Sequence, residues 1–390
     1  MTAPMTASNE AGPQTELQWS YLPTAHTVPL LDVTRGELVE SVHLGSLAVV
    51  GTDGRLLYAL GDPMLVTYLR SAAKPFQALP LVESGAFERY GFTSQELAVI
   101  CASHSGEDIH VAAVQSILDK IGLSADYLKC GIHQPFSKEV VRRLREQGQQ
   151  PTVLHCNCSG KHAGMLALAL HHGWSPEGYY RPSHPVQQMM QQVVAEVCGL
   201  RPEQLVVGVD GCTAATFALP LYHMAWGFAR LAQPQRADFS PGRQQAVSTV
   251  VAAMRAHSEM VGGLSRPYRL DTDLMKVGQP GKEGSRAMVS KIGAEGLHCL
   301  GLLPVAAEAG LLPGGGVGLA VKVADGDKVT DSEGNYRARD QITIELLRQL
   351  RTLDEPTWVE LREKYAVLIK NNRGEVVGGV RPSFRLSAAL

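Results

Sequence analysis

The sequence lacks long hydrophobic runs, an excess of charge of one sign and a recognisable export signal. Because no stretch of roughly 18 apolar residues occurs, a membrane-spanning helix is excluded. The 36 basic and 38 acidic side chains leave a formal charge of −2, so we expect neither nucleic acid nor a membrane surface as a partner. Residues 1–27 have no basic start and no apolar core, and we expect them to form the flexible tail of a cytoplasmic protein.

The cysteines exclude complete disulfide pairing and argue against an ordinary zinc finger. The chain has seven cysteines, an odd number, and no two are spaced as Cys-x-x-Cys. A cytoplasmic protein keeps its thiols reduced. Each cysteine is therefore expected to fill the core, to bind a metal or to act as a nucleophile.

Strand signals cluster toward the two ends of the chain. Asp53-Gly54 separates two runs rich in Val, Leu and Tyr, which predicts a hairpin between residues 38 and 61. A matching hairpin is predicted around residues 371–374, and a further strand over residues 317–323.

The middle of the chain carries helix signals. Helices are predicted over residues 70–79, 139–146, 159–170, 185–198 and 241–257. Pro80 is expected to end or kink the first of them. We therefore predict an α+β fold, in which N- and C-terminal strands form an antiparallel sheet flanked by helices. A mainly helical region, roughly residues 100–260, would be inserted between these strands.

The first candidate for catalysis is Ser71-x-x-Lys74 in the first predicted helix. At this spacing the hydroxyl and the amine share one helix face, within hydrogen-bond reach. A neutral lysine there can take the serine proton and make the serine a nucleophile. Backbone N–H groups at the helix start can stabilise an oxyanion. A capping serine beside a surface lysine gives the same spacing.

Two further elements follow in the order typical of S-x-x-K hydrolases. Ser103-x-Ser105 lies in a small polar loop after an apolar segment and resembles the S-x-N element of those enzymes. Lys291-x-Gly293 resembles their K-T-G strand. Each also occurs by chance, as a turn or a surface lysine, but the three in this order indicate a Ser–Lys hydrolase.

A metal site is the third hypothesis. Cys158 lies three and four residues before Lys161 and His162 at a predicted helix start, a spacing that suits two ligands, and Cys212 follows a predicted strand. Two thiolates and a nitrogen suit tetrahedral zinc. The spacing leaves open whether Cys156 shares a metal with Cys158, and whether these cysteines only fill the core.

The chain resembles the zinc-binding, rhizobial-type L-asparaginases, the asparaginase II family, from about residue 28 to 383. The resemblance lies in four blocks: Arg70-Ser-Ala-Ala-Lys-Pro75, Cys101-Ala-Ser-His-Ser-Gly-Glu107, Cys156-Asn-Cys-Ser-Gly-Lys-His162 and Gly208-Val-Asp-Gly-Cys212. It implies a single catalytic domain over residues 28–390, with a fold similar to serine β-lactamases, penicillin-binding proteins and serine glutaminases. It also implies a homodimer that hydrolyses L-asparagine to L-aspartate and ammonia.

The resemblance implies roles for individual residues, and gives none to Cys156. Ser71 with Lys74 and Ser103 with Lys291 match the two Ser–Lys pairs of the family; Cys158, Lys161 and Cys212 match its zinc ligands; His162 and Asp210 match residues around the zinc.

The expected mechanism has Ser71 attack the amide, with Lys74 as general base. Ser103, held by Lys291, would pass a proton to the leaving ammonia. The oxyanion donors would be the N–H of Ser71 and one near Gly293. An alternative has Ser103 attack with Lys291 as base.

Arg70 and Asp210 are candidates for pairing the charges of the substrate, and zinc would tune substrate binding. Two other functions remain open: a different Ser–Lys amidohydrolase, such as a glutaminase or a β-lactam-hydrolysing enzyme, and a zinc-binding protein without turnover. Glutamine differs from asparagine by one methylene, which is worth only about 1–3 kcal/mol in a pocket.

Overall fold

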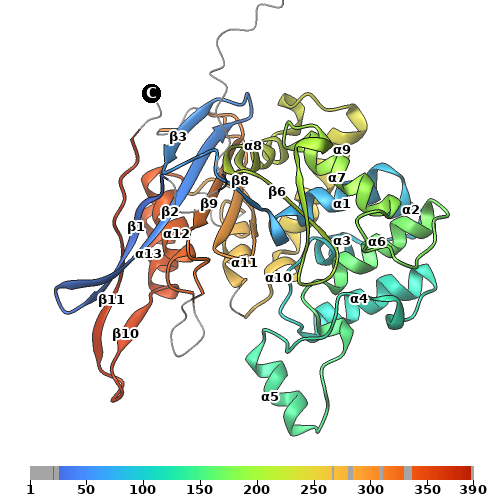
Figure 1. Cartoon of the computed structure of the whole chain (residues 1–390), viewed down its shortest axis with the longest axis horizontal. Coiled ribbons are helices and arrows are strands. Elements are labelled where there is room, and N and C mark those ends of the chain that lie inside the picture. The colour runs from blue at the N-terminus through green and yellow to red at the C-terminus, as the bar shows by residue number, and fades with distance from the viewer. Residues whose placement is uncertain are drawn as a thin grey trace, which may run out of the picture.

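A large antiparallel sheet forms one half of the molecule (Figure 1). The computed structural model describes residues 21, 26–265, 268–279, 284–306, 311–328 and 336–387. The strand order is β10-β11-β1-β2-β9-β8-β7, with β3 paired to β2. The strands are β1 (Val28–Arg35), β2 (Leu38–Gly51), β3 (Leu56–Leu60), β7 (Met288–Ile292), β8 (Leu297–Leu302), β9 (Val317–Val323), β10 (Leu368–Lys370) and β11 (Val376–Pro382).

Strands from the two ends of the chain pair directly in this sheet. β1 pairs antiparallel with β11, and Val33 lies opposite Val380. The hairpin predicted at Asp53-Gly54 joins β2 to β3, and the second predicted hairpin joins β10 to β11. The predicted strand over residues 317–323 is β9. The α+β arrangement with a sheet of N- and C-terminal strands is therefore confirmed.

Most of the helices fill the other half, to the right of the sheet in Figure 1, whereas the two C-terminal helices lie on the side of the sheet. The helices of the described residues are α1 (Lys74–Glu83), α2 (Ala86–Arg89), α3 (Ser94–Ile100), α4 (Asp108–Ile121), α5 (Lys138–Glu146), α6 (Ser159–His171), α7 (Pro185–Val197), α8 (Leu221–Ala232), α9 (Pro241–Ala256), α10 (Ser258–Gly262), α11 (Arg269–Met275), α12 (Arg339–Gln349) and α13 (Glu355–Lys364). Short 3₁₀ turns are η1 (Arg70–Ala73), η2 (Ala125–Tyr127), η3 (Val153–His155), η4 (Pro202–Gln204) and η5 (Pro234–Arg236). A second sheet of β4 (Val66–Tyr68), β6 (Ala215–Pro220) and β5 (Val206–Val209) lies among them and was not predicted.

The first predicted helix differs from the expectation in both shape and length. Residues 70–73 form the 3₁₀ turn η1, and α1 then runs to Glu83 with Pro80 inside it. The expectation that the helix could end at Pro80 was wrong. Pro80 removes one N–H donor, but its own carbonyl accepts from Ser84 N–H at 3.0 Å, and Leu79 and Leu81 on either side are buried. Core packing therefore carries the helix one turn further.

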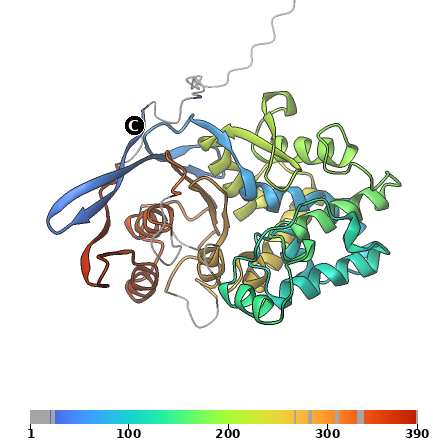
Figure 2. The same cartoon turned by 60° about the horizontal axis from the view of Figure 1, so that its bottom comes forward.

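The central strands of the sheet are buried on both faces. In β2, Ala48 and Val50 join the core shared with α1 and α8, whereas Leu47 and Val49 join the core shared with α12. Figure 2 shows the orange-red helices α12 and α13 beneath the sheet. The hydrophobic core between the sheet and the helices therefore extends to the start of α1.

The described part of the chain contains no helix that could cross a membrane on grounds of length and hydrophobicity. All seven cysteines are free and buried. The predicted tail over residues 1–27 lies almost wholly outside the described residues.

Candidate active site

Ser71 lies in a strained turn between the small sheet and the first helix. Leu69 N–H donates to Phe217 O in β6 at 2.9 Å and anchors the chain before the turn. Arg70 then adopts a left-handed backbone with φ 48°, which is unfavourable for a residue with a side chain and is typical of functional sites. This turn buries Ser71 and sends the Lys74 side chain into the core, where it is 1% exposed.

The Lys74 ammonium joins three segments of the chain. Lys74 Nζ donates to Ala102 O, to Ser103 Oγ at 3.1 Å and to Asn157 O at 3.4 Å. Among the described residues, Ser71 is not one of its hydrogen-bond acceptors. Lys74 and Ser103, which the sequence placed in different Ser–Lys pairs, are thus hydrogen-bonded to each other.

Ser103 is held in place by its own backbone and by the histidine that follows it. Ser103 N–H donates to Val261 O at 3.0 Å. His104 Nδ1 accepts from Gly106 N–H at 3.1 Å, so its Nε2–H donates to Ser159 Oγ at 2.9 Å. Burial lowers the pKa of His104 and keeps it neutral. His104 had no predicted role, although it lies inside the Cys101–Glu107 block.

Lys291 lies in β7 and has a carboxylate partner. Lys291 Nζ donates to Asp271 Oδ2 at 3.2 Å and to Ile292 O at 3.0 Å, and lies 5.4 Å from the centre of the Tyr268 ring. Burial lowers the pKa of Lys291 to about 8, against the opposing effect of Asp271. Asp271 and Tyr268 were missed, because a single acid or tyrosine near a short helix forms no recognisable motif.

The expected oxyanion donor near Gly293 is not Gly293 itself. Gly293 N–H donates to Leu297 O at 3.0 Å and closes the turn between β7 and β8. The N–H of Ser71 remains a candidate, because it lies in the first turn of η1.

A cluster of two sulfurs and one amine lies at the start of α6. Lys161 Nζ donates to Cys212 Sγ at 3.0 Å, and the neighbouring Cys158, together with burial, raises the pKa of the Cys212 thiol. Burial alone would lower the pKa of Lys161, but Cys212, Cys158 and Asp210 together raise it. The three predicted zinc ligands are therefore brought together.

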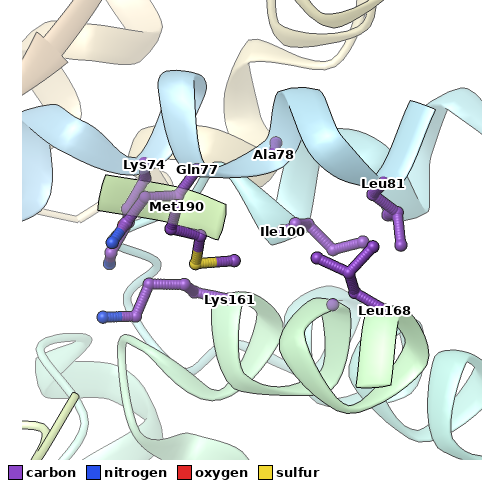
Figure 3. Close-up of a pocket in the computed structure, with 9 residues that line it drawn as sticks. Lys74, Gln77, Ala78, Leu81, Ile100, Lys161, Leu168 and Met190 are labelled. Carbon is purple, nitrogen blue, oxygen red and sulfur yellow. The ribbon is translucent and has the colours of Figure 1, made fainter. Parts of the chain in front are cut away.

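A close helix contact places this cluster beside the Ser103 loop. At Gly160 a Cβ atom would lie 2.2 Å from Val99 O, so only glycine allows α6 to approach α3 this closely. Lys74 and Lys161 consequently line the same narrow void, together with Gln77 and Met190 (Figure 3). Figure 3 shows both amine nitrogens at the same end of that void.

The donor set around Cys212 fits a zinc ion only when the Lys161 amine has lost its proton, because an ammonium has no lone pair for a metal. Within the described ranges, no group of three or more His, Cys, Asp or Glu side chains is arranged for a metal, so a site here needs the Lys161 amine as its third donor. His162 Nδ1 is hydrogen-bonded to Tyr179 Oη at 2.7 Å. His162 Nε2 is buried without a partner in the described structure and lies beside Cys212.

Cys156 contacts a different neighbour from Cys158. Its thiol donates to Cys130 O at 3.6 Å. The contact with Cys130 raises the pKa of Cys156 to about 12, although Cys158 opposes this. Cys156 therefore contacts the backbone of Cys130, and not the Lys161–Cys212 pair.

Arg70 and Asp210, the two candidates for substrate charges, form an ion pair. Arg70 Nε and one terminal nitrogen lie 2.9 and 2.8 Å from Asp210 Oδ1. Gly211 N–H also donates to Asp210 Oδ1, at 2.6 Å. Burial would raise the pKa of Asp210, but Lys161 and Arg70 lower it. This pair links the Ser71 turn to the sulfur cluster.

Comparisons with known proteins give one family and a set of distant structures. The L-asparaginase II family matches residues 31–382. The solved structure of native Mglu is 16% identical with a TM-score of 0.42, over 79% of this chain and 65% of Mglu, so the chain spans less than two thirds of Mglu. A Bacillus glutaminase is 12% identical with a TM-score of 0.35, over 79% and 91% of the two chains. A probable glutaminase of Bacillus subtilis is 12% identical with a TM-score of 0.33, over 82% and 88%.

A search among curated proteins found no match. The match to the family, in contrast, spans nearly the whole chain and contains every candidate site residue described above. The chain belongs to the L-asparaginase II family.

Proposed function

We propose that the protein is an L-asparaginase, which hydrolyses the side-chain amide of L-asparagine to L-aspartate and ammonia through an acyl-enzyme on Ser71. One observation carries this proposal: Lys74, one turn after Ser71, is buried and hydrogen-bonded to Ser103 Oγ at 3.1 Å. Two serines and a lysine form the relay that acyl transfer from an amide requires. Family membership supports the choice of substrate.

The proposed relay moves one proton in each half-reaction. Neutral Lys74 takes the proton of Ser71 Oγ as that oxygen attacks the amide carbon. Lys74 then supplies a proton through Ser103 to the leaving nitrogen, the C–N bond breaks and ammonia departs. Water attacks the ester with Lys74 again as base, and Lys74 returns that proton to Ser71 Oγ as the C–O bond breaks and aspartate is released. The Ser71–Lys74 contact would form on substrate binding, since catalytic hydrogen bonds often tighten only in the complex.

Two groups would stabilise the negative charge that develops on the amide oxygen. The N–H of Ser71 points from the first turn of η1, where helix N–H groups lack intrahelical acceptors. Lys291, as an ammonium, would add a positive charge, whereas Ser103 is hydrogen-bonded to Lys74. This assignment leaves Lys291 a supporting residue and not the base of a second nucleophile.

Arg70 and Asp210 would recognise the charged end of the substrate. The α-carboxylate of asparagine would take the place of Asp210 against the Arg70 guanidinium, while Asp210 accepts from the α-ammonium. When the zwitterionic substrate enters this ion pair, each of the two charged side chains still faces an opposite charge. The pair adjoins Ser71, so it would orient the amide toward that oxygen.

Cys158, Lys161 and Cys212 would hold a zinc ion. The ion would supply a fixed positive charge that keeps the thiols deprotonated and orients the polar end of the substrate. Zinc content by mass spectrometry should fall in Cys212→Ser and stay at the wild-type level in Cys156→Ser, its buried neighbour outside the donor set. Equal zinc in both variants, or none in wild type, would remove zinc from the proposal.

The test of the function is ammonia release from L-asparagine and L-glutamine by wild type, Ser71→Ala and Ser105→Ala. Ser105 is a matched control, because it is buried near Ser103 and its hydroxyl has no partner among the described residues. We expect asparagine turnover in wild type and Ser105→Ala, and loss by roughly 10³-fold or more in Ser71→Ala.

Other outcomes of this test would redirect the proposal. Glutamine as the better substrate would make the enzyme a glutaminase. Folded, zinc-loaded wild type without turnover of either amide would favour a zinc-binding protein. The homodimer and the cytoplasmic location, both implied earlier, are proposals too; light scattering coupled to gel filtration tests the first, and cell fractionation tests the second.

A further inference from the structure

We propose that Asp271 is a positioning residue for the amide hydrolysis: it holds Lys291 in place as an ammonium at the Ser–Lys site. This inference rests on the proposed function. Asp271 belongs to none of the sequence motifs, and lies in the first turn of α11, fully buried against β7.

Both oxygens of the Asp271 carboxylate are occupied by donors from β7. Oδ1 accepts from Ser290 Oγ at 2.7 Å and from Ile292 N–H at 3.0 Å. Oδ2 accepts from Lys291 Nζ at 3.2 Å and from the same Ile292 N–H at 2.9 Å. Three consecutive residues of one strand are therefore bound by one carboxylate. This arrangement fixes the direction in which Lys291 points.

A neutral hydrogen-bond chain supports the carboxylate from behind. Ser290 Oγ donates to Asp271, so it accepts from His298 Nε2–H at 2.8 Å. His298 Nδ1 then accepts from Thr343 Oγ1 at 3.1 Å. Burial lowers the pKa of His298, so the ring is neutral. Lys291 is therefore the cation that balances Asp271.

Stability alone does not account for such a pair. A buried ion pair gains little over apolar residues of the same size, because both charges lose their hydration. What the pair does provide is a lysine that stays charged in a site without water contact. Burial alone would neutralise Lys291, and its carboxylate partner opposes that.

Several other charged or titratable groups face Lys291. The groups that contact Lys291, or that share an electrostatic effect on the pKa with it, are Asp271 and Tyr268 at α11, Cys299 on β8, Lys74 on α1, Cys101 after α3, and Cys158 before α6. His298 on β8 lies beside Asp271. Asp271 is the carboxylate among them and the group that Lys291 contacts directly. Removal of the Asp271 charge should therefore lower the pKa of Lys291, so that Lys291 loses its proton at a lower pH.

The experiment compares the pH dependence of L-asparagine turnover in wild type, Asp271→Asn and Asp273→Asn. Asp273 is a matched control on the same helix, because its carboxylate binds Tyr365 Oη at 2.6 Å and Lys364 Nζ at 2.7 Å, away from Lys291. We expect the alkaline limb of kcat to move down by about 1–3 pH units in Asp271→Asn. Turnover at pH 8 should fall roughly fivefold or more, whereas Asp273→Asn keeps the wild-type profile.

A folded Asp271→Asn with an unshifted profile, or with only its acid limb moved, would overturn the inference. If that variant does not fold, Lys291→Met and the double variant Asp271→Asn/Lys291→Met replace it, since the double variant leaves no buried charge unpaired. Equal kcat in these two proteins would support the inference. A further loss in the double variant would show that Asp271 acts independently of Lys291, and would overturn it.

The proposed function can fail separately in the same assay. If wild type and Asp273→Asn release no ammonia from L-asparagine, the asparaginase assignment fails. If wild type and Asp273→Asn turn over normally and the alkaline limb of kcat is unchanged in Asp271→Asn, only the role of Asp271 is rejected.

Discussion

Two buried lysines in this protein differ in what surrounds the charge. Lys74 and Lys291 are 1% and 0% exposed. Lys74 donates to three uncharged oxygens, those of Ala102, Ser103 and Asn157, whereas Lys291 donates to the Asp271 carboxylate. A lysine without a carboxylate can give up its proton and act as a base, while one paired with a carboxylate is held charged.

The difference originates in the elements that carry the two lysines. Lys74 lies at the start of α1, where its side chain crosses to two loops, before α4 and before α6. Lys291 lies near the end of β7, in a sheet whose neighbouring helix α11 supplies the acid. A loop site can rearrange around a reacting group, whereas a strand in a sheet holds its side chain in one direction.

The largest effect is expected when Lys74 is replaced. Lys74→Met removes the proposed general base, and kcat/KM for L-asparagine should fall by roughly 10²–10⁴-fold. Its unfolding midpoint should fall less than that of Lys291→Met, because neutral acceptors lose a donor but no carboxylate is left unpaired. Steady-state ammonia release and urea unfolding measure the two quantities. Activity within tenfold of wild type would assign the base to another residue.

Replacement of Lys291 should affect stability far more. Lys291→Met leaves Asp271 buried without its cation, which costs about 3–5 kcal/mol of unfolding free energy. Adding Asp271→Asn should recover most of this loss, because the pair is then neutral. Urea unfolding of the three proteins tests the expectation. Equal destabilisation by Lys74→Met and Lys291→Met would contradict the idea that only Lys291 leaves a carboxylate unpaired.

Replacement of Ser103 tests whether its hydrogen bond to Lys74 is needed for turnover. Ser103→Ala removes the proposed proton relay and should lower kcat by about 10²-fold. The control Ser105→Ala, two residues away, should stay within about twofold, in line with the small effect of substitutions outside such features. A similar loss in both variants would point to damage of the loop and not to a lost relay.

The smallest effect concerns pH. Lys291 has a lowered pKa of about 8, so above that pH the ammonium gives way to the neutral amine. If the charged form is required, kcat/KM should fall about tenfold per pH unit beyond 8. Lys291→Arg, whose side chain stays charged, should remove this limb even if its activity is lower. An alkaline limb that persists in Lys291→Arg would belong to a different group.

Local signals predicted much of the secondary structure. Ser137 and Ser240 cap α5 and α9 through hydrogen bonds to Val140 N–H and Arg243 N–H, and Asp53-Gly54 makes its hairpin. The small sheet of β4, β5 and β6 was missed, because three short strands among helices have no long alternating pattern. Pro80 was misjudged, since the packing of α1 outweighs one lost hydrogen bond.

The sequence by itself determined which chemistry the chain carries: serines, lysines and thiols at spacings of three or four residues, within reach of a single helical turn. Only the tertiary structure decided which of them meet. Lys74 and Ser103 are 29 residues apart, Lys161 and Cys212 51, and Arg70 and Asp210 140. Asp271, without a motif, reaches Lys291 through the packing of α11 on β7. Local rules act through short backbone geometry, whereas these contacts depend on how helices and strands pack around one core.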